Sequence, residues 1–223
     1  PLYSSAASDV YKRQTLMGSI NYKILGRAGA GSLIAEFLFR EIGVNYEITF
    51  VDPKKSKLDD LSSAHPQGKI PTLVCPDQVL IFETLAIINH ITDRYDKLVP
   101  DRRTPLFDRY WQFLSLLATS IYPAYHRQHH SRYYVKEESQ SDLRVRAQKE
   151  QSEIYDYIEK ELNPYICGDL LTAADFYLYM LLRWDLYKNA LYQDRPKLKS
   201  FANMMRNRPS VVTVLDNQPN RKI

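Results

Sequence analysis

The residues best suited to chemistry lie between positions 68 and 91, where two short apolar runs flank a tight turn and an apolar helical pattern follows. Pro71 opens the first run, and because proline donates no ladder hydrogen bond, Ile70 can present its backbone outward. Glu83 and Thr84 stand where the second run gives way to the helix. Unpaired N–H groups at a helix start favour a carboxylate. The stretch therefore predicts a binding site built from backbone groups and one acidic side chain.

This stretch resembles the glutathione-binding half of the glutathione transferase family. In that family a cis-proline before the third strand presents backbone to the cysteinyl part of glutathione, and an acidic residue followed by Ser or Thr at the next helix start holds the γ-glutamyl end. Ile70, Pro71, Glu83 and Thr84 match that pattern position by position. The resemblance implies that these four residues bind glutathione.

A glycine-rich turn from Gly26 to Gly31, followed by Ser32, is the second candidate feature. Its spacing fits neither a dinucleotide fingerprint nor a P-loop. One interpretation is a tight strand-to-helix turn with Ser32 as the helix cap. The other is that glycine lets the backbone approach a bound thiol, whose thiolate Ser32 or an N–H near Gly31 would stabilise. The sequence leaves both open.

The elements that position these residues follow from hydrophobic periodicity. The sequence predicts a strand over 20–26, an apolar-faced helix from Leu33 that stops at Gly43, and a strand over 46–51. With the hairpin and helix of 68–91, this gives β-α-β with a right-handed crossover, then β-β-α. That order is the thioredoxin-like layout implied by the family resemblance.

After Pro105 no strand pattern follows, so the second half is predicted to be all-helical. A long helix is expected over 105–130 with a kink at Pro123, and another over 140–162. Thr172 and Asp175 form a variant capping box with a structural role.

Asp194 is expected to cap a further helix. The predicted domains are a disordered or non-native segment over 1–19, a thioredoxin-like glutathione-binding domain over 20–94, a linker over 95–104, an all-helical domain over 105–217 and a tail over 218–223.

A polar loop over 52–67 holds several lysines. The resemblance implies that Lys55 or Lys57 contacts the glycyl carboxylate of glutathione. The alternative is that both are charged surface residues exposed to solvent. His65 is interpreted as structural.

The stretch from Tyr165 to Asp175 resembles the bacterial beta-class transferases, and the resemblance extends over about residues 20–215. Two positions depart from that class. Gly31 stands where its members carry a cysteine, and Tyr122 aligns with a histidine near the substrate sulfur. Tyr122 keeps a hydroxyl that can donate to a thiolate, although it could instead pack between domains. Trp111 and Tyr125 are predicted, with Tyr122, to line a hydrophobic pocket.

Composition narrows the classes of partner. The 223 residues carry a formal net charge of +4 without a Lys/Arg block, which argues against nucleic acid. No apolar run approaches the roughly 20 residues of a membrane span. Cys75 and Cys167 lack metal or redox spacing and fit a reducing cytoplasm. His126 and His130 share a helix face beside His129, but no third ligand is visible, so no metal is expected.

The leading hypothesis is a cytoplasmic glutathione transferase that conjugates glutathione, as co-substrate without a further cofactor, to hydrophobic electrophiles. The family resemblance also implies a homodimer. Ser32, Tyr122 or backbone amides would lower the thiol pKa. One alternative is a transferase-like protein that binds glutathione without catalysis. Another is a glutathione-dependent isomerase or peroxidase on the same fold.

Overall fold

The computed structural model describes residues 21–51 and 65–219. The expectations for residues 1–19, Lys55 and Lys57 lie outside this part of the chain. The chain divides into two compact units, the first running to Ile87 and resuming at Thr213, the second running from Ile88 to Val212. The division thus falls inside a helix rather than at the expected linker, and the C-terminal stretch belongs to the first unit.

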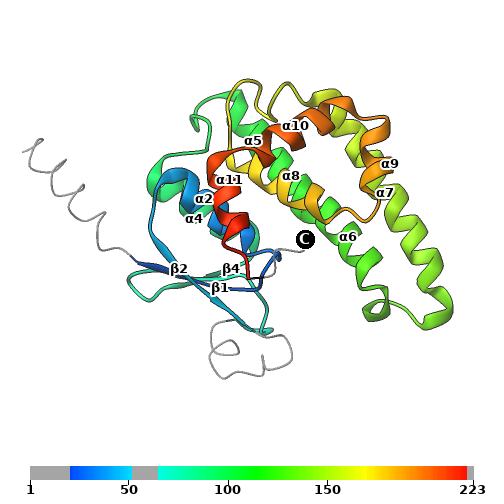
Figure 1. The fold of residues 1–223 in the computed structure, drawn as a ribbon, viewed down its shortest axis with the longest axis horizontal. Helices are drawn as coiled ribbons and strands as arrows, with labels where there is room; N and C mark the ends of the chain where they lie inside the picture. The colour runs from blue at the N-terminus through cyan, green and yellow to red at the C-terminus, as the bar shows by residue number, and fades with distance from the viewer. Residues whose placement is uncertain (1–20, 52–64, 220–223) are drawn as a thin grey trace, which may run out of the picture. The chain divides into compact units, whose positions relative to one another are not determined.

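The first unit contains a four-stranded mixed sheet in the order β2-β1-β3-β4 (Figure 1). Strand β1 pairs with β2 in parallel and with β3 antiparallel, and β3 pairs antiparallel with β4. This arrangement confirms the predicted βαβ-ββα layout. The elements are β1 (Tyr22–Gly26), α2 (Leu33–Ile42), β2 (Tyr46–Phe50), β3 (Thr72–Val74), β4 (Leu80–Phe82) and α4 (Thr84–Tyr95).

The core of this unit forms where α2 covers the sheet. Ile24, Phe37 and Leu73 are fully buried, and the rings of Tyr22 and Phe39 lie 4.7 Å apart. Alternation along β1 sends its next residue to the opposite face, where Leu25 packs against a smaller apolar set of Val51, Ile70 and Val74. The sheet is therefore held from both faces close to the segments that carry the predicted site.

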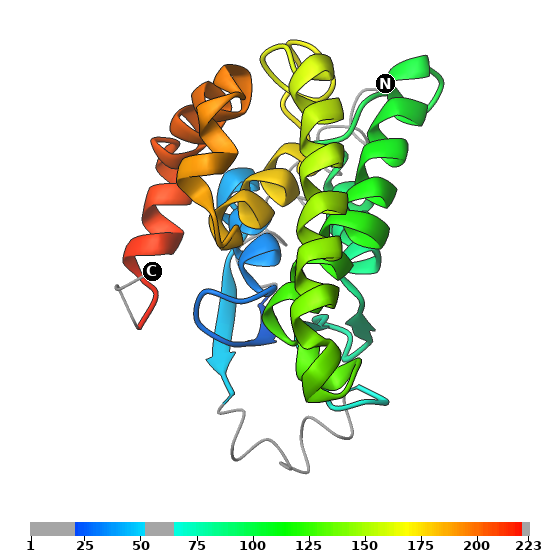
Figure 2. The same ribbon diagram turned by 90° about the vertical axis from the view of Figure 1, so that its right-hand side faces the viewer.

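The second unit is helical, as predicted (Figure 2). Its helices are α5 (Pro105–Leu116), α6 (Tyr122–His129), α7 (Gln140–Glu161), α8 (Ala173–Trp184), α9 (Lys188–Gln193) and α10 (Pro196–Arg206), and α11 (Pro209–Asp216) runs across the boundary into the first unit. Within the described residues, no helix combines the length and apolarity needed to span a membrane.

A π-helical segment, η1 (Leu117–Ile121), interrupts the long helix expected over 105–130. Tyr122 N–H donates to the carbonyl of Leu117, five residues back. Pro123 follows directly and has no N–H to offer the preceding turn. The predicted irregularity is thus present, but as a π segment just before the proline.

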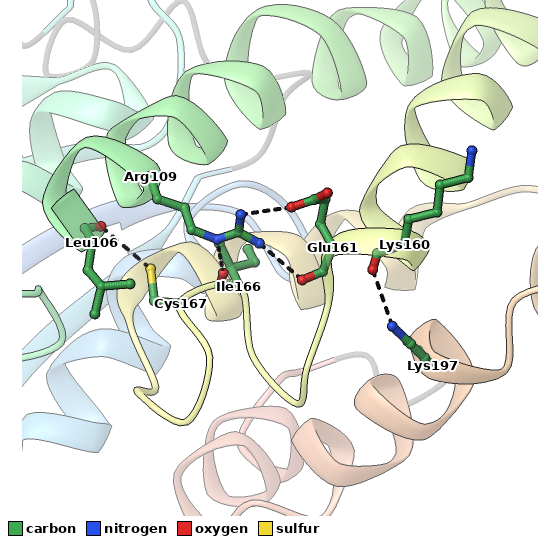
Figure 3. Close-up of polar contacts among 7 residues, drawn as sticks. All are labelled: Leu106, Arg109, Lys160, Glu161, Ile166, Cys167 and Lys197. Carbon is green, nitrogen blue, oxygen red and sulfur yellow. Dashed lines mark hydrogen bonds and ion pairs between the residues drawn. The ribbon is translucent and has the colours of Figure 1, made fainter.

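Arg109 fastens the loop between α7 and α8 (Figure 3). Its Nε donates to the carbonyl of Ile166 at 2.6 Å, and its other nitrogens donate to the Glu161 carboxylate at 2.8 Å and the Glu161 carbonyl at 3.0 Å. Cys167 lies in this loop with its thiol toward the carbonyl of Leu106. Burial raises the pKa of Cys167 to about 11, so the thiol stays neutral at physiological pH.

The start of α10 corrects one capping prediction. Arg195 holds the N-cap position, and no side chain of the segment caps the helix. Instead the carboxylate of Glu159, on α7, accepts from the backbone N–H groups of Lys197 and Leu198 at 2.9 and 2.8 Å. Asp194 is therefore not the cap, because a carboxylate from another helix already satisfies the first-turn donors.

Candidate functional site

One edge of the sheet collects three segments of the first unit. Leu25 is paired with Thr72, and Thr72 is paired with Phe82. The end of β1, the start of β3 and the end of β4 therefore meet at the same edge. The segments that continue from these ends are the glycine turn (residues 26–32), Ile70-Pro71 and Glu83-Thr84, which sequence analysis had singled out separately.

The Ile70–Pro71 peptide bond is cis. Pro71 is buried, whereas Ile70 is half-buried and lies outside the paired part of β3. Among the described residues, the backbone N–H and carbonyl of Ile70 have no hydrogen-bond partner. An extended ligand could pair with these groups as a further strand would.

Glu83 links β4 to α4 with a backbone φ of 69°, in the left-handed region that non-glycine residues seldom occupy. Its side chain is 74% exposed. The first intrahelical bond of α4 runs from the N–H of Ile87 to the carbonyl of Glu83, so the N–H groups from Thr84 to Ala86 precede it and face out of the helix end. Strained backbone of this kind is concentrated at binding sites.

His65 supports Glu83 from below the surface. The ring is buried against Phe82, with centroids 4.7 Å apart, and Nδ1 accepts from the backbone N–H of Gln67 at 3.0 Å. That bond assigns the ring proton to Nε2, which lies 3.9 Å from Oε1 of Glu83. The histidine expected to be structural thus also directs an N–H toward the acidic residue of the site.

The glycine turn engages the Ser32 side chain differently from the prediction. Ser32 is fully buried, and its hydroxyl donates to the carbonyl of Arg27 at 3.1 Å. Ser32 is the N-cap residue of α2, as predicted, but its side chain makes no cap bond to the helix. A Cβ on Gly26 would lie 2.4 Å from Cβ of Ser32, so glycine is required there.

Because the Ser32 hydroxyl is already engaged, the backbone supplies the available donors in this turn. Leu33 and Ile34 already donate to the carbonyls of Ala30 and Gly31. Within the described residues, the N–H groups of Gly31 and Ser32 make no such bond. These two amides, at the start of a ten-residue helix, are suited to stabilise a negative sulfur.

The aromatic residues predicted to line a pocket belong to the second unit and fall into two groups. Tyr122 and Tyr125 both lie against Trp184, with ring centroids 5.8 and 5.4 Å apart. Trp111 lies elsewhere, edge-on to Tyr110 at 5.9 Å. Sequence analysis missed Trp184, although its place at the end of an apolar helix was a usable signal.

His126, His129 and His130 lie in one ring cluster, with centroids of neighbouring rings 4.6 and 4.7 Å apart. His126 also meets the Tyr134 hydroxyl at 2.7 Å. Over residues 21–51 and 65–219, no group of three or more His, Cys, Asp or Glu side chains is arranged to hold a metal ion.

Two protein-family models match the chain, one in each half. The family model described as "Glutathione S-transferase, N-terminal domain" matches residues 32–94, and that described as "Glutathione S-transferase, C-terminal domain" matches residues 121–209.

Named relatives agree with these matches. The chain is 28% identical over 202 residues to glutathione S-transferase GstA of Escherichia coli O157:H7, covering 86% of this chain and 96% of the relative. It is 26% identical over 171 residues to glutathione S-transferase GST-4.5 of Xanthomonas campestris, covering 73% and 81%.

Solved structures share the fold. A sphingomonad glutathione S-transferase complexed with glutathione has a TM-score of 0.77 at 24% identity, covering 88% of this chain and 98% of the other. Ure2p in complex with glutathione has a TM-score of 0.78 at 19% identity, covering 87% and 97%.

Proposed function

The chain belongs to the glutathione transferase family, and on that premise we propose that it binds glutathione along the sheet edge and transfers its thiolate to a hydrophobic electrophile. The observation that carries the proposal is the meeting of three unsatisfied backbone segments in the first unit. Ile70 would pair with the cysteinyl part, Glu83 and the α4 amides would hold the γ-glutamyl end, and Gly31 and Ser32 would face the sulfur.

The nucleophile belongs to the substrate, so the protein's task is to position the thiol and to lower its pKa. Because the Ser32 hydroxyl is buried and donates to Arg27, we assign thiolate stabilisation to the amides of Gly31 and Ser32. Tyr122 stays an additional candidate donor. Tyr122, Tyr125 and Trp184 offer an aromatic lining for the electrophile. A homodimer is proposed from family membership alone.

Thiolate absorbance tests the catalytic part of this proposal. The bound thiol should titrate at least one unit below the ordinary value of about 8.5, because two amides at a helix start favour the charged form. The measurement is a pH titration of ultraviolet absorbance with and without glutathione, with the protein's own tyrosine signal subtracted. An unshifted thiol, with glutathione bound, would contradict thiol activation.

Glu83→Gln should weaken glutathione binding about tenfold or more, because a hydrogen bond to a charged group is worth about 1.5–3 kcal/mol. The substitution keeps the side-chain shape and removes the negative charge opposite the γ-glutamyl ammonium. Calorimetric titration measures the dissociation constant. Glu47→Gln, an exposed acid on β2, is the matched control and should bind as the wild type does. Equal affinity in both variants would refute the assignment of Glu83.

A binding protein without catalysis is the second candidate, favoured by Gly31 at the position expected for cysteine and by the engaged hydroxyl of Ser32. It predicts glutathione affinity without turnover of any electrophile. Glutathione-dependent isomerase or peroxidase chemistry would instead show turnover with those substrate classes, so a substrate panel separates the three.

A further inference from the structure

The C-terminal stretch from Thr213, red in Figure 1, belongs to the first unit, and one of its residues is hydrogen-bonded to the glycine turn. Gln218 lies there with 7% of its surface exposed. It is separated by 189 positions from Gly29, to which it is hydrogen-bonded. A buried amide is costly unless its polar groups are paired, so its bonds define where the stretch docks.

The side-chain amide of Gln218 is paired at both ends. Its Oε1 accepts from the N–H of Gly29 at 3.0 Å. Its Nε2 donates to Oε2 of Glu36 at 3.0 Å and to the carbonyl of Val214 at 3.3 Å. Since Gly29 offers a donor and the other two groups offer acceptors, the network admits one orientation of the amide.

Gly29 is the corner of the glycine turn. Its φ is 68°, and the following residue, Ala30, donates to the carbonyl of Arg27 at 3.1 Å to close the turn. The next two amides, of Gly31 and Ser32, are those assigned above to the thiolate. The bond from Gly29 to Gln218 therefore fixes the corner from which these amides project.

We propose that Gln218 is a positioning residue, which holds the glycine turn so that the Gly31 and Ser32 amides face the glutathione sulfur. This inference rests on the proposed function. Gln218 touches no reacting atom and acts through Gly29.

The hydrogen bond between Gln218 and Glu36 is the second contact that holds the C-terminal stretch on the first unit. It is 3% exposed, its Oε1 is buried without a partner among the described residues, and Gln218 is the donor to its Oε2. Burial raises the pKa of the Tyr46 phenol on β2, the charge of Glu36 adds to that shift, and Arg40 on α2 opposes it. Loss of Gln218 would strip Glu36 of a donor and Gly29 of an acceptor together.

The test compares Gln218→Ala and Gln218→Glu in the full chain, with exposed Asn217→Ala as the matched control. Gln218→Ala should weaken glutathione binding about fivefold, as expected for one lost hydrogen bond, and should raise the pKa of the bound thiol. In ligand-free protein, the hydrogen-bonded amides of Gly29 and Ala30 should exchange hydrogen about tenfold faster.

Gln218→Glu supplies the readout that a purely structural role would not give. Its carboxyl can accept from Gly29 and can donate to Glu36 only while the pair shares a proton. The variant should therefore resemble wild type near about pH 5.5 and Gln218→Ala near about pH 8.5.

Each outcome decides one claim. Unchanged amide exchange in Gln218→Ala overturns the positioning of the turn. Faster exchange with unchanged glutathione affinity and thiol pKa overturns the link to the sulfur. If the wild type does not bind glutathione, the proposed function fails. Faster amide exchange in Gln218→Ala would even then support the conclusion that Gln218 stabilises the glycine turn.

Discussion

Asp175→Ala should lower the free energy of unfolding by about 4 kcal/mol, beyond the range of most single substitutions. Asp175 is fully buried in the second unit. Its Oδ1 accepts from the N–H of Ile166, and its Oδ2 accepts from both the N–H and the hydroxyl of Thr172, each at 2.8 Å. Alanine would leave three buried donors without an acceptor.

Asp175 and Arg109 both hydrogen-bond to Ile166, so the loop before α8 depends on both side chains. Ile166 donates its N–H to Asp175 while its carbonyl accepts from Arg109. The two charged side chains therefore hold opposite sides of one peptide segment. Burial raises the pKa of Asp175 to about 6, and the bonds from Ile166 and Thr172 oppose that shift. At about pH 8 the group is ionised and its bonds are strongest.

Urea unfolding at about pH 8 measures the effect of Asp175→Ala. The control is Asp169→Ala, an exposed aspartate in the same loop, which should stay within about 0.5 kcal/mol of wild type. Asp175→Asn should fall between them, because an amide offers one acceptor where the carboxylate offers two. A loss below about 1 kcal/mol in Asp175→Ala would show that the loop is held by other contacts.

Local patterns predicted the parts of the fold that local physics determines. Period-two and helical spacing predicted the order of strands and helices along the first unit and the helical second unit, and the predicted Thr172–Asp175 box is present. The Ile70-Pro71 and Glu83-Thr84 segments were found because their residue types limit the backbone there. Their meeting at one edge follows from the hairpin register, which period-two alternation constrains strongly.

The contacts that local patterns could not predict come from distant parts of the chain. Ser32 has the type of a helix cap, yet its hydroxyl bonds to Arg27 because the turn packs it beneath Gly26. The carboxylate of Glu159, on α7, and not that of Asp194 accepts the hydrogen bonds from the first N–H groups of α10. Gln218 was assigned to a polar tail, because its partners Gly29 and Glu36 lie far away in the sequence and no local pattern indicates them.

Glu36→Gln should remove a pH dependence worth about 3 kcal/mol from the stability of the protein. Burial raises the pKa of Glu36 from 4.5 to about 7, and the hydrogen bond from Gln218 opposes that shift. Between these values the folded state binds more protons than the unfolded state, so the stability of the wild type falls as pH rises from about 4.5 to about 7. Below that window both states are protonated and the penalty is absent.

The amide introduced by Glu36→Gln cannot ionise, so the difference in unfolding free energy between variant and wild type should grow in favour of the variant across that window. Asp175 titrates in a neighbouring range, but it is present in both proteins and cancels from the difference. Denaturant unfolding at about pH 4.5 and pH 8 measures this difference in unfolding free energy. The control is exposed Glu47→Gln, whose difference from wild type should be the same at both pH values. A constant difference would mean that Glu36 reaches solvent when ionised. That outcome would also weaken the Gln218 proposal, which needs this carboxyl to stay buried against the amide.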